Sequence, residues 1–271
     1  MSETQTSTGA LFRAGNLAGA IEAANAAVRK APADLSARVL LAEMLVFSGN
    51  LERADVILDA AGQADPEATV VVAEFRQLLR ADMARRQLRR DGRVPEFLGE
   101  PTATQRAQLA ALVALRAGDV PEAARLAAEA EAGRPRVPGR AGETPFDDFR
   151  DADDLAAGSF EVLTTTGKYF WIPVERVESI EFHPPRRARD LMWRRASMSV
   201  RNGPDGEVYL PAIYGSEDAT LEDQFRLGRS TDWTDGDGPV RGIGQRLFLV
   251  GEEATGIMDL TTLEFDALAE E

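Results

Sequence analysis

The chain has 271 residues, 44% of them hydrophobic, which indicates a globular protein long enough for two domains. It contains no cysteine, which excludes disulfides, thiolate metal sites and cysteine nucleophiles. The formal net charge of −14 argues against binding of nucleic acid or of anionic membranes, and no apolar run is long enough to span a bilayer. The first residues, MSETQTSTGA, lack the basic start and apolar core of a signal peptide, so we expect a cytoplasmic protein.

A short phrase recurs in the first part of the chain. Leu11–Leu17 reads LFRAGNL and Leu45–Leu51 reads LVFSGNL, 34 residues later. That period, with small residues where helices cross, is typical of tetratricopeptide repeats. A third, displaced copy begins at Gly118 and keeps the alanine spacing, although an alanine-rich bundle could align in this way by chance. We predict a tetratricopeptide-like layer of paired α-helices over residues 1–135, with a groove for a partner segment.

A long helix is expected from Glu67 to about Arg90, and its second half is rich in arginine. On a 3.6-residue period these arginines fall on two adjoining stripes. We interpret the stripes as a positively charged strip for an acidic partner segment, while a solvated helix face is the simpler alternative. The candidate partner-binding residues of this strip are Arg76, Arg80, Arg86, Arg89 and Arg90.

Proline and glycine interrupt the helical pattern after Gly133, in the stretch GRPRVPGRAGETP. We predict a linker over residues 136–150 and a C-terminal domain over residues 151–271. Short alternating runs there indicate a mostly antiparallel β domain, interrupted by one short helix from about Glu217 to Leu227. The expected fold class is α+β. The predicted strands are Phe160–Thr165, Tyr169–Ile172, Glu178–Phe182, Ala196–Arg201, Glu207–Ile213, Arg246–Val250 and Ile257–Phe265.

The chemistry-bearing residues of the C-terminal half give little support for an enzyme. His183 is the single histidine, and no nucleophile motif accompanies it. The acidic cluster does not fit a calcium loop, which needs glycine at its sixth position and glutamate at its twelfth. We predict no catalytic residue, metal or cofactor; the enzyme alternative is a metal-dependent hydrolase that uses these acidic residues. The cluster consists of Asp147, Asp148, Asp151, Asp153 and Asp154.

Aromatic and charged phrases mark the same half of the chain. Tryptophans beside Asp–Arg pairs can form a core or a recognition surface, and the usual burial of large aromatic side chains favours a core. Both interpretations stay open at this point. The candidate partner-binding residues here are Trp171, Asp190, Trp193, Trp233 and Arg246.

The order of these phrases resembles the ImpE family, also called SciE or TagJ. They follow the N-terminal repeat as Phe146–Asp154 (FDDFRDADD), Tyr169–Pro173, Arg189–Trp193, Thr231–Trp233 and Gly244–Arg246. The resemblance implies a cytoplasmic, non-enzymatic accessory protein of bacterial type VI secretion. It further implies binding to a segment of the small subunit of the contractile sheath, and a link to the ATPase that recycles sheaths.

The expected function is therefore that of an adaptor, and the resemblance does not identify its binding surface. A general peptide-binding co-chaperone is the alternative. Such a protein would hold a peptide carboxylate with a clamp of basic side chains. The clamp would have to be built from arginine, because Lys30 and Lys168 are the only lysines.

Overall fold

Helices occupy the first half of the chain and strands most of the second, which confirms the α+β class. The computed structural model describes residues 7–64, 69–216, 218 and 220–268. The predicted start of the long helix at Glu67 lies outside these residues. The first seven helices are α1 (Thr8–Arg13), α2 (Leu17–Lys30), α3 (Leu35–Phe47), α4 (Leu51–Ala64), α5 (Thr69–Asp91), α6 (Ala103–Arg116) and α7 (Val120–Gly133).

The recurring sequence phrase encodes the turn inside each helix pair. Gly15, Gly49 and Gly118 all have φ between 81° and 83°, a left-handed conformation that ends one helix at little cost for glycine. The next residue then begins the following helix: the Asn16 side chain accepts from the Gly19 amide at 2.7 Å. The Asn50 and Asp119 side chains likewise accept a hydrogen bond from the amide three residues later, at 3.2 Å each. The periodic signal is therefore local turn chemistry.

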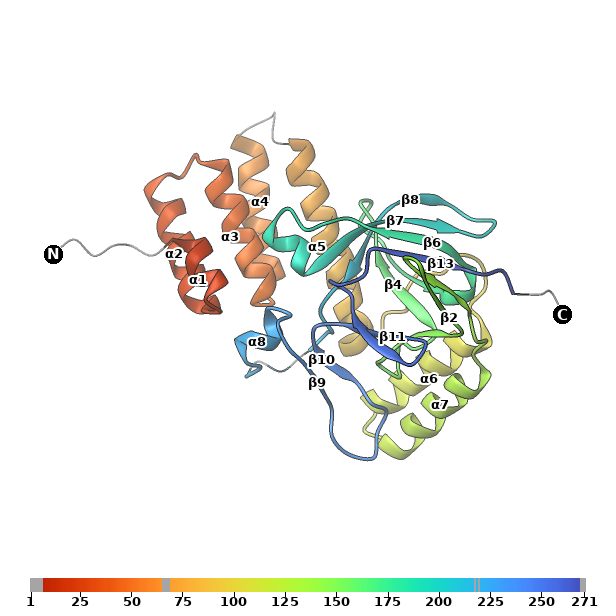
Figure 1. Ribbon diagram of the computed structural model, residues 1–271. Coiled ribbons are helices and arrows are strands. Elements are labelled where there is room, and N and C mark those ends of the chain that lie inside the picture. The colour runs from red at the N-terminus through yellow and green to blue at the C-terminus, as the bar shows by residue number, and fades with distance from the viewer. Residues whose placement is uncertain (1–6, 65–68, 217, 219, 269–271) are drawn as a thin grey trace.

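The helix pairs do not form one continuous stack. Pairs α1–α2 and α3–α4 pack side by side with α5 against α4, and small residues such as Ala20, Ala54 and Ala61 are buried between them. Helices α6 and α7 form a third pair, but they lie beside the sheet, away from α1–α4 (Figure 1). There the Gln105 amide donates to the Ser159 hydroxyl at 3.2 Å. The third copy of the phrase thus builds a helix pair without extending the layer.

The C-terminal half is built on one large antiparallel sheet of eight strands, in the order β2-β1-β13-β6-β7-β8-β4-β5. A three-stranded sheet, β12-β11-β3, and a two-stranded sheet, β10-β9, complete the strands. The large sheet comprises β1 (Gly139–Ala141), β2 (Thr144–Phe146), β4 (Ser159–Leu163), β5 (Tyr169–Pro173), β6 (Val177–Phe182), β7 (Trp193–Val200), β8 (Asp205–Pro211) and β13 (Thr262–Phe265). The small sheets comprise β3 (Phe149–Asp151), β9 (Thr231–Trp233), β10 (Gly242–Gly244), β11 (Leu247–Val250) and β12 (Glu253–Gly256).

Several predicted boundaries differ from the structure. Residues 136–150, predicted as a linker, contain β1, β2 and the start of β3. Pro145 is accepted in β2 because this strand lies at the sheet edge, where one backbone face needs no donor. Within the predicted strand Ile257–Phe265, only the last four residues form a strand, β13. The predicted helix is reduced to α8 (Asp223–Arg226), and its predicted start at Glu217 lies outside the described residues. Short 3-10 turns, η2 (Val174–Arg176) and η3 (Ala188–Leu191), link other strands.

Two hydrophobic cores hold the molecule together. The first is shared between the helices and the sheet: Trp193 of β7 is fully buried, with its ring 6.0 Å from that of Phe75 on α5, edge to face. The second lies within the β half and contains a phenylalanine cluster around Phe149, whose ring is 5.1 Å from that of Phe248. Because the first core crosses from helices to sheet, the two halves pack as one body.

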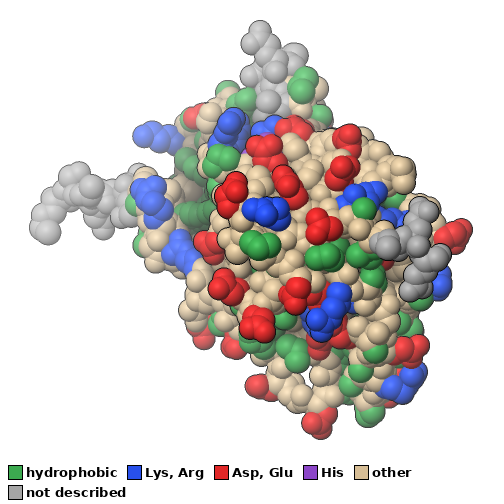
Figure 2. Space-filling model, turned by 45° about the vertical axis from the view of Figure 1, so that its right-hand side comes forward, with side chains coloured by type: hydrophobic (Ala, Val, Ile, Leu, Met, Phe, Trp, Pro, Cys, Tyr) green, Lys and Arg blue, Asp and Glu red, His purple; other side chains and the backbone are tan. Residues whose placement is uncertain are grey.

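The surface reflects the acidic composition. Figure 2 shows a face on which acidic side chains are spread widely with basic side chains between them. None of the described helices is both long and apolar enough to cross a membrane.

Candidate functional site

A groove of about 380 Å³ opens between the helical layer and the segment that follows β8. One wall comes from the turn between α3 and α4, where the apolar residues Val46, Phe47 and Leu51 are almost fully buried. The half-buried apolar residues of the lining are Met83 and Leu221. The long helix α5 forms the floor, and Met192 and Ile213 add apolar surface from the β half. We call this the interdomain groove. The polar residues that line it are Ser48, Glu52, Asp82, Arg85, Arg86, Gln87, Arg89, Arg90, Tyr214, Ser216, Asp218 and Arg226.

Two of the groove arginines, Arg85 and Arg86, donate hydrogen bonds to backbone carbonyls of the groove walls. The Arg86 Nε atom lies 3.2 Å from Asp82 Oδ2, and its Nη1 donates to the Gly49 carbonyl at 3.1 Å. Arg86 therefore satisfies a backbone carbonyl at the end of α3, where helices lack internal partners. Arg85 is buried at the base of the groove. Arg90 is exposed and pairs with Asp91 at 2.9 Å.

Arg89 differs from its neighbours. It is half-buried in the groove and makes no hydrogen bond or ion pair with any other residue that the structure describes. Its side chain runs along Gly215: a Cβ atom at that glycine would lie 3.3 Å from Arg89 Nε. A guanidinium offers five donors in a planar fork that matches a carboxylate. The groove thus combines two half-buried apolar side chains, Met83 and Leu221, with a cation that can pair with an acidic ligand.

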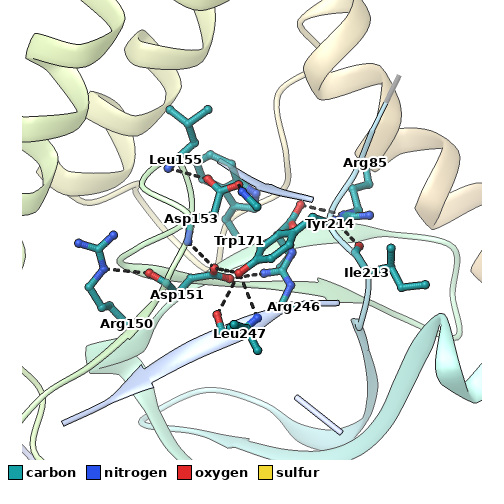
Figure 3. A network of polar contacts seen from close by, with 12 residues as sticks. Arg85, Arg150, Asp151, Asp153, Leu155, Trp171, Ile213, Tyr214, Arg246 and Leu247 are labelled. Carbon is teal, nitrogen blue, oxygen red and sulfur yellow. Dashed lines mark hydrogen bonds and ion pairs between the residues drawn. The ribbon is translucent and has the colours of Figure 1, made fainter. Parts of the chain in front are cut away.

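Beneath the groove lies a buried ionic network (Figure 3). Arg85 of α5 donates from Nε and Nη2 to the two oxygens of Glu161, at 3.0 and 3.1 Å, and also to the Ile213 carbonyl at 3.2 Å. Arg246 contacts Glu161 as well and donates to Asp151 Oδ2 at 2.6 Å. The Tyr214 hydroxyl donates to Asp151 Oδ1 at 2.8 Å. The network joins α5, β3, β4 and the segment before β11.

The charges in this network balance one another. Burial alone would raise the pKa of Glu161, but the Arg85 and Arg246 guanidinium groups hold it well below its ordinary range. Burial raises the pKa of Asp151 to about 6, against the opposing effect of Arg246. Both carboxylates are therefore ionised at neutral pH. Burial and the neighbouring Glu161 raise the pKa of Tyr169, so its hydroxyl stays protonated and donates to Glu161.

The predicted arginine strip is split between three environments. Arg76 faces α4, where it forms ion pairs with Asp55 at 2.7 Å and with Asp59. Arg80 is exposed and donates to Gln77 at 3.2 Å. The other three members, Arg86, Arg89 and Arg90, line the interdomain groove. The helical period predicts that these residues share one helix, but it does not predict that Arg76 pairs with α4 or that Arg86 reaches the Gly49 carbonyl.

Three of the predicted aromatic and charged residues are core residues. Trp171, Trp193 and Arg246 are 2%, 0% and 2% exposed, so direct contact with a partner would require the core to open. Asp190 instead accepts hydrogen bonds from the Arg186 and Arg187 amides, at 2.8 and 3.0 Å, and so fixes η3. Trp233 is half-buried, its ring 6.1 Å from that of Tyr214. None of these five predicted residues lines the interdomain groove.

The acidic cluster is largely engaged in structural contacts. Asp148 pairs with Arg134 at 2.6 Å, and Asp154 pairs with Arg150 at 2.7 Å. Asp153 accepts from two backbone amides. His183 lies 3.0 Å from the Ser197 hydroxyl. Among residues 7–64, 69–216, 218 and 220–268, no group of three acidic or histidine side chains is placed to hold a metal ion.

Part of the groove was not predicted. Met192, Leu221 and Arg226 line it from the β half, although nothing in their local sequence marks them as groove residues. Their position depends on the packing of the segment after β8 against the helices. Arg229 of the same segment donates to the Arg13 carbonyl at 3.0 Å, and Asp223 accepts from the Leu17 amide at 2.9 Å. These contacts tie the segment to the first repeat.

Both halves of the chain match known protein families. Residues 11–79 match the tetratricopeptide repeat family, and residues 143–264 match the family described as ImpE protein. The chain is 33% identical, over 94% of its own length and 90% of the relative's, to the type VI secretion system accessory component TagJ of Pseudomonas aeruginosa. It also superposes on the crystal structure of protein VPA1032 from Vibrio parahaemolyticus with a TM-score of 0.89, at 28% identity, covering 96% of this chain and 97% of that one.

Proposed function

The chain belongs to the ImpE family, and we propose that it is a non-enzymatic accessory protein of bacterial type VI secretion that acts in the cytoplasm. The relative from Pseudomonas aeruginosa, with which it aligns over 94% of its length, supports the accessory role. The engagement of the acidic cluster in structural ion pairs supports a binding protein rather than a hydrolase.

The partner is a segment of the small subunit of the contractile sheath, and the interdomain groove receives it. The observation that carries this proposal is the combination of half-buried apolar side chains, Met83 and Leu221, with the half-buried guanidinium of Arg89 in one groove. A helical or extended segment with apolar side chains and one acidic residue fits both features. The segment's carboxylate would form a charge-assisted pair with Arg89.

Capture of this segment links the sheath to the ATPase that recycles it. The family resemblance, and no particular contact in the structure, supports this part of the proposal. The adaptor would hold the small subunit while the surface outside the interdomain groove stays accessible to other components.

Isothermal titration calorimetry tests the proposal directly. The small sheath subunit is titrated into the full chain, first intact and then without its terminal helical segment. We expect binding of the intact subunit and no binding of the shortened one. Binding of both forms with equal affinity, or of neither, would remove the captured segment from the mechanism.

A groove variant locates the contact. Leu221→Asp places a charge on the half-buried apolar lining and should abolish binding, whereas Val113→Asp on the exposed surface of α6 should leave it unchanged. Unrelated peptides that end in a free carboxylate provide a further comparison. Equal affinity for such peptides would favour the co-chaperone alternative over a sheath-specific adaptor.

A further inference from the structure

A second groove, of about 840 Å³, lies at the opposite end of the β half. It is bounded by β1 and β2, by the hairpin of β11 and β12, and by the residues that lead into β13. Phe146 and Leu260 are buried and form an apolar base. The lining shares no residue with the interdomain groove. We call it the edge groove.

The edge groove is strongly acidic. Asp147, Glu252, Glu253 and Asp259 line it, all four are exposed, and no lysine or arginine is among the lining residues. Within the part of the chain that the structure describes, none of their side chains has a hydrogen bond or ion pair. Elsewhere, exposed carboxylates such as Glu122 and Glu129 pair with arginine. Like charges gathered around one hollow create a negative potential that attracts a basic partner.

Unpaired strand edges border the same groove. Strand β2 ends the eight-stranded sheet and β12 ends the three-stranded sheet, so each has one edge without a partner strand. In β2, Pro145 lacks a backbone N–H, whereas β12 contains no proline. An edge strand with free N–H and C=O groups is a template for an added strand.

The hairpin register shows which backbone groups are available. Val250 pairs with Glu253 and Leu249 with Ala254, and the two intervening residues form the turn. In a two-residue hairpin the pair that closes the turn exchanges hydrogen bonds, and the next pair does not. The N–H and C=O of Ala254 therefore point outward from the edge. The side chains of Glu253 and Thr255 meanwhile line the groove.

We propose that the edge groove docks an extended, basic segment of a partner protein. The segment adds a strand to β12 through backbone hydrogen bonds, and its lysine or arginine side chains pair with the four carboxylates. This site is separate from the interdomain groove, and the proposed capture of a sheath segment does not depend on it.

Fluorescence anisotropy with synthetic peptides tests the charge requirement. The probes are a labelled eight-residue peptide of alternating arginine and valine and its glutamate–valine counterpart, each titrated with the full chain. We expect the basic peptide alone to bind. The triple variant D147N/E252Q/E253Q should weaken that binding at least tenfold. The triple variant E22Q/E100Q/E264Q, which removes the same charge from exposed positions outside the groove, should bind as the parent does. Equal weakening by both variants would overturn the site, because binding would then follow net charge.

A second peptide tests whether binding requires backbone hydrogen bonds to β12. An arginine–valine peptide with N-methyl groups on alternate residues keeps every side chain and charge but cannot donate along one edge. We expect it to bind at least tenfold more weakly than the unmodified peptide. Equal affinity of the two peptides would overturn strand addition. Hydrogen exchange at the Ala254 amide, which points outward from the edge, should slow when the unmodified peptide binds, and unchanged exchange there would likewise contradict the proposal.

Discussion

Arg85 on α5 and Glu161 on β4 form a two-point ion pair at 3.0 and 3.1 Å, with both side chains almost fully buried. The pair crosses the boundary between the helical layer and the sheet. Arg85 also lines the interdomain groove and donates to the Ile213 carbonyl, on the opposite wall. The position of one groove wall relative to the other therefore depends on this buried pair.

We expect Glu161→Gln to destabilise the protein strongly. The substitution leaves Arg85 and Arg246 without their shared counter-charge inside the core, which typically costs about 3–5 kcal/mol of unfolding free energy. Urea denaturation at pH 7 measures the loss. As a control, Glu122→Gln removes one partner of an exposed pair on α7 and should change stability little. Similar losses in the two variants would show that the network is not a main stabilising contact.

Local chemistry was predictable from the sequence, and long-range partners were not. The repeated glycine-asparagine phrase predicted helix pairs correctly, since a left-handed glycine and a following cap act within a few residues. The same reasoning placed Arg76 and Arg89 on one charged strip. Arg76 forms an ion pair with Asp55 on α4, whereas Arg89 lies against Gly215. Neither neighbour can be deduced from helical spacing.

The C-terminal half shows the same limit. Three-residue strands such as β1 and β2 are too short to give an alternating pattern, so they were assigned to a linker. Trp171 and Arg246 stand out in the sequence as distinctive residues, but that does not separate a buried network from a recognition surface. Their partners Tyr169 and Asp151 determine the outcome, because each satisfies a polar group that would otherwise be buried alone.

Gly242→Ala should disturb the buried ionic network by displacing the Tyr214 ring. A Cβ atom at this position would lie 2.1 Å from the Tyr214 ring, so the ring must move away from its hydrogen bond with Asp151. Overpacking of this kind costs about 1–3 kcal/mol, seen as a lower thermal midpoint. Gly206→Ala serves as the control, because a Cβ atom there meets no other atom within 4 Å. A Gly242 variant as stable as the Gly206 variant would contradict the tight packing of Tyr214.

Glu43 should make stability depend on pH. Burial raises the pKa of this α3 carboxyl from 4.5 to about 7, against Arg189 and Arg187, which lower it, while Asp190 raises it further. The folded protein then holds a proton that the unfolded chain releases between pH 4.5 and 7. The contribution of Glu43 to the unfolding free energy therefore falls as the pH rises through that window, by up to about 3 kcal/mol.

Comparison of Glu43→Gln with the parent protein isolates this contribution. Glutamine cannot titrate, so the variant should gain stability relative to the parent when urea denaturation is repeated from pH 5 to pH 8. The exposed Glu22→Gln substitution on α2 should show no such pH-dependent gain. A difference between Glu43→Gln and the parent that stays constant across this range would mean that Glu43 titrates normally.

Arg89→Glu should weaken binding of the sheath segment more than any other single charge reversal in the arginine strip that leaves the fold intact. Arg89 makes no hydrogen bond or ion pair with another described residue, but its charge lowers the pKa of the buried Asp153 and Glu161, so its reversal acts on the fold as well as on the ligand. Reversal of Arg86 breaks, in addition, the contact with the Gly49 carbonyl. We expect calorimetry to show a loss of roughly 1–3 kcal/mol in binding free energy. The thermal midpoint should also fall, because the new carboxylate repels the buried Asp153 and Glu161, so the titration is made well below the midpoint of the variant. Arg29→Glu makes the same change in net charge at an exposed position on α2 outside the groove, and it should leave the affinity almost unaltered. If both reversals lower the affinity equally, long-range charge accounts for the effect and Arg89 is not the contact. If neither reversal lowers the affinity, the segment carries no acidic residue at this position, and the apolar side chains of the groove alone must hold the segment.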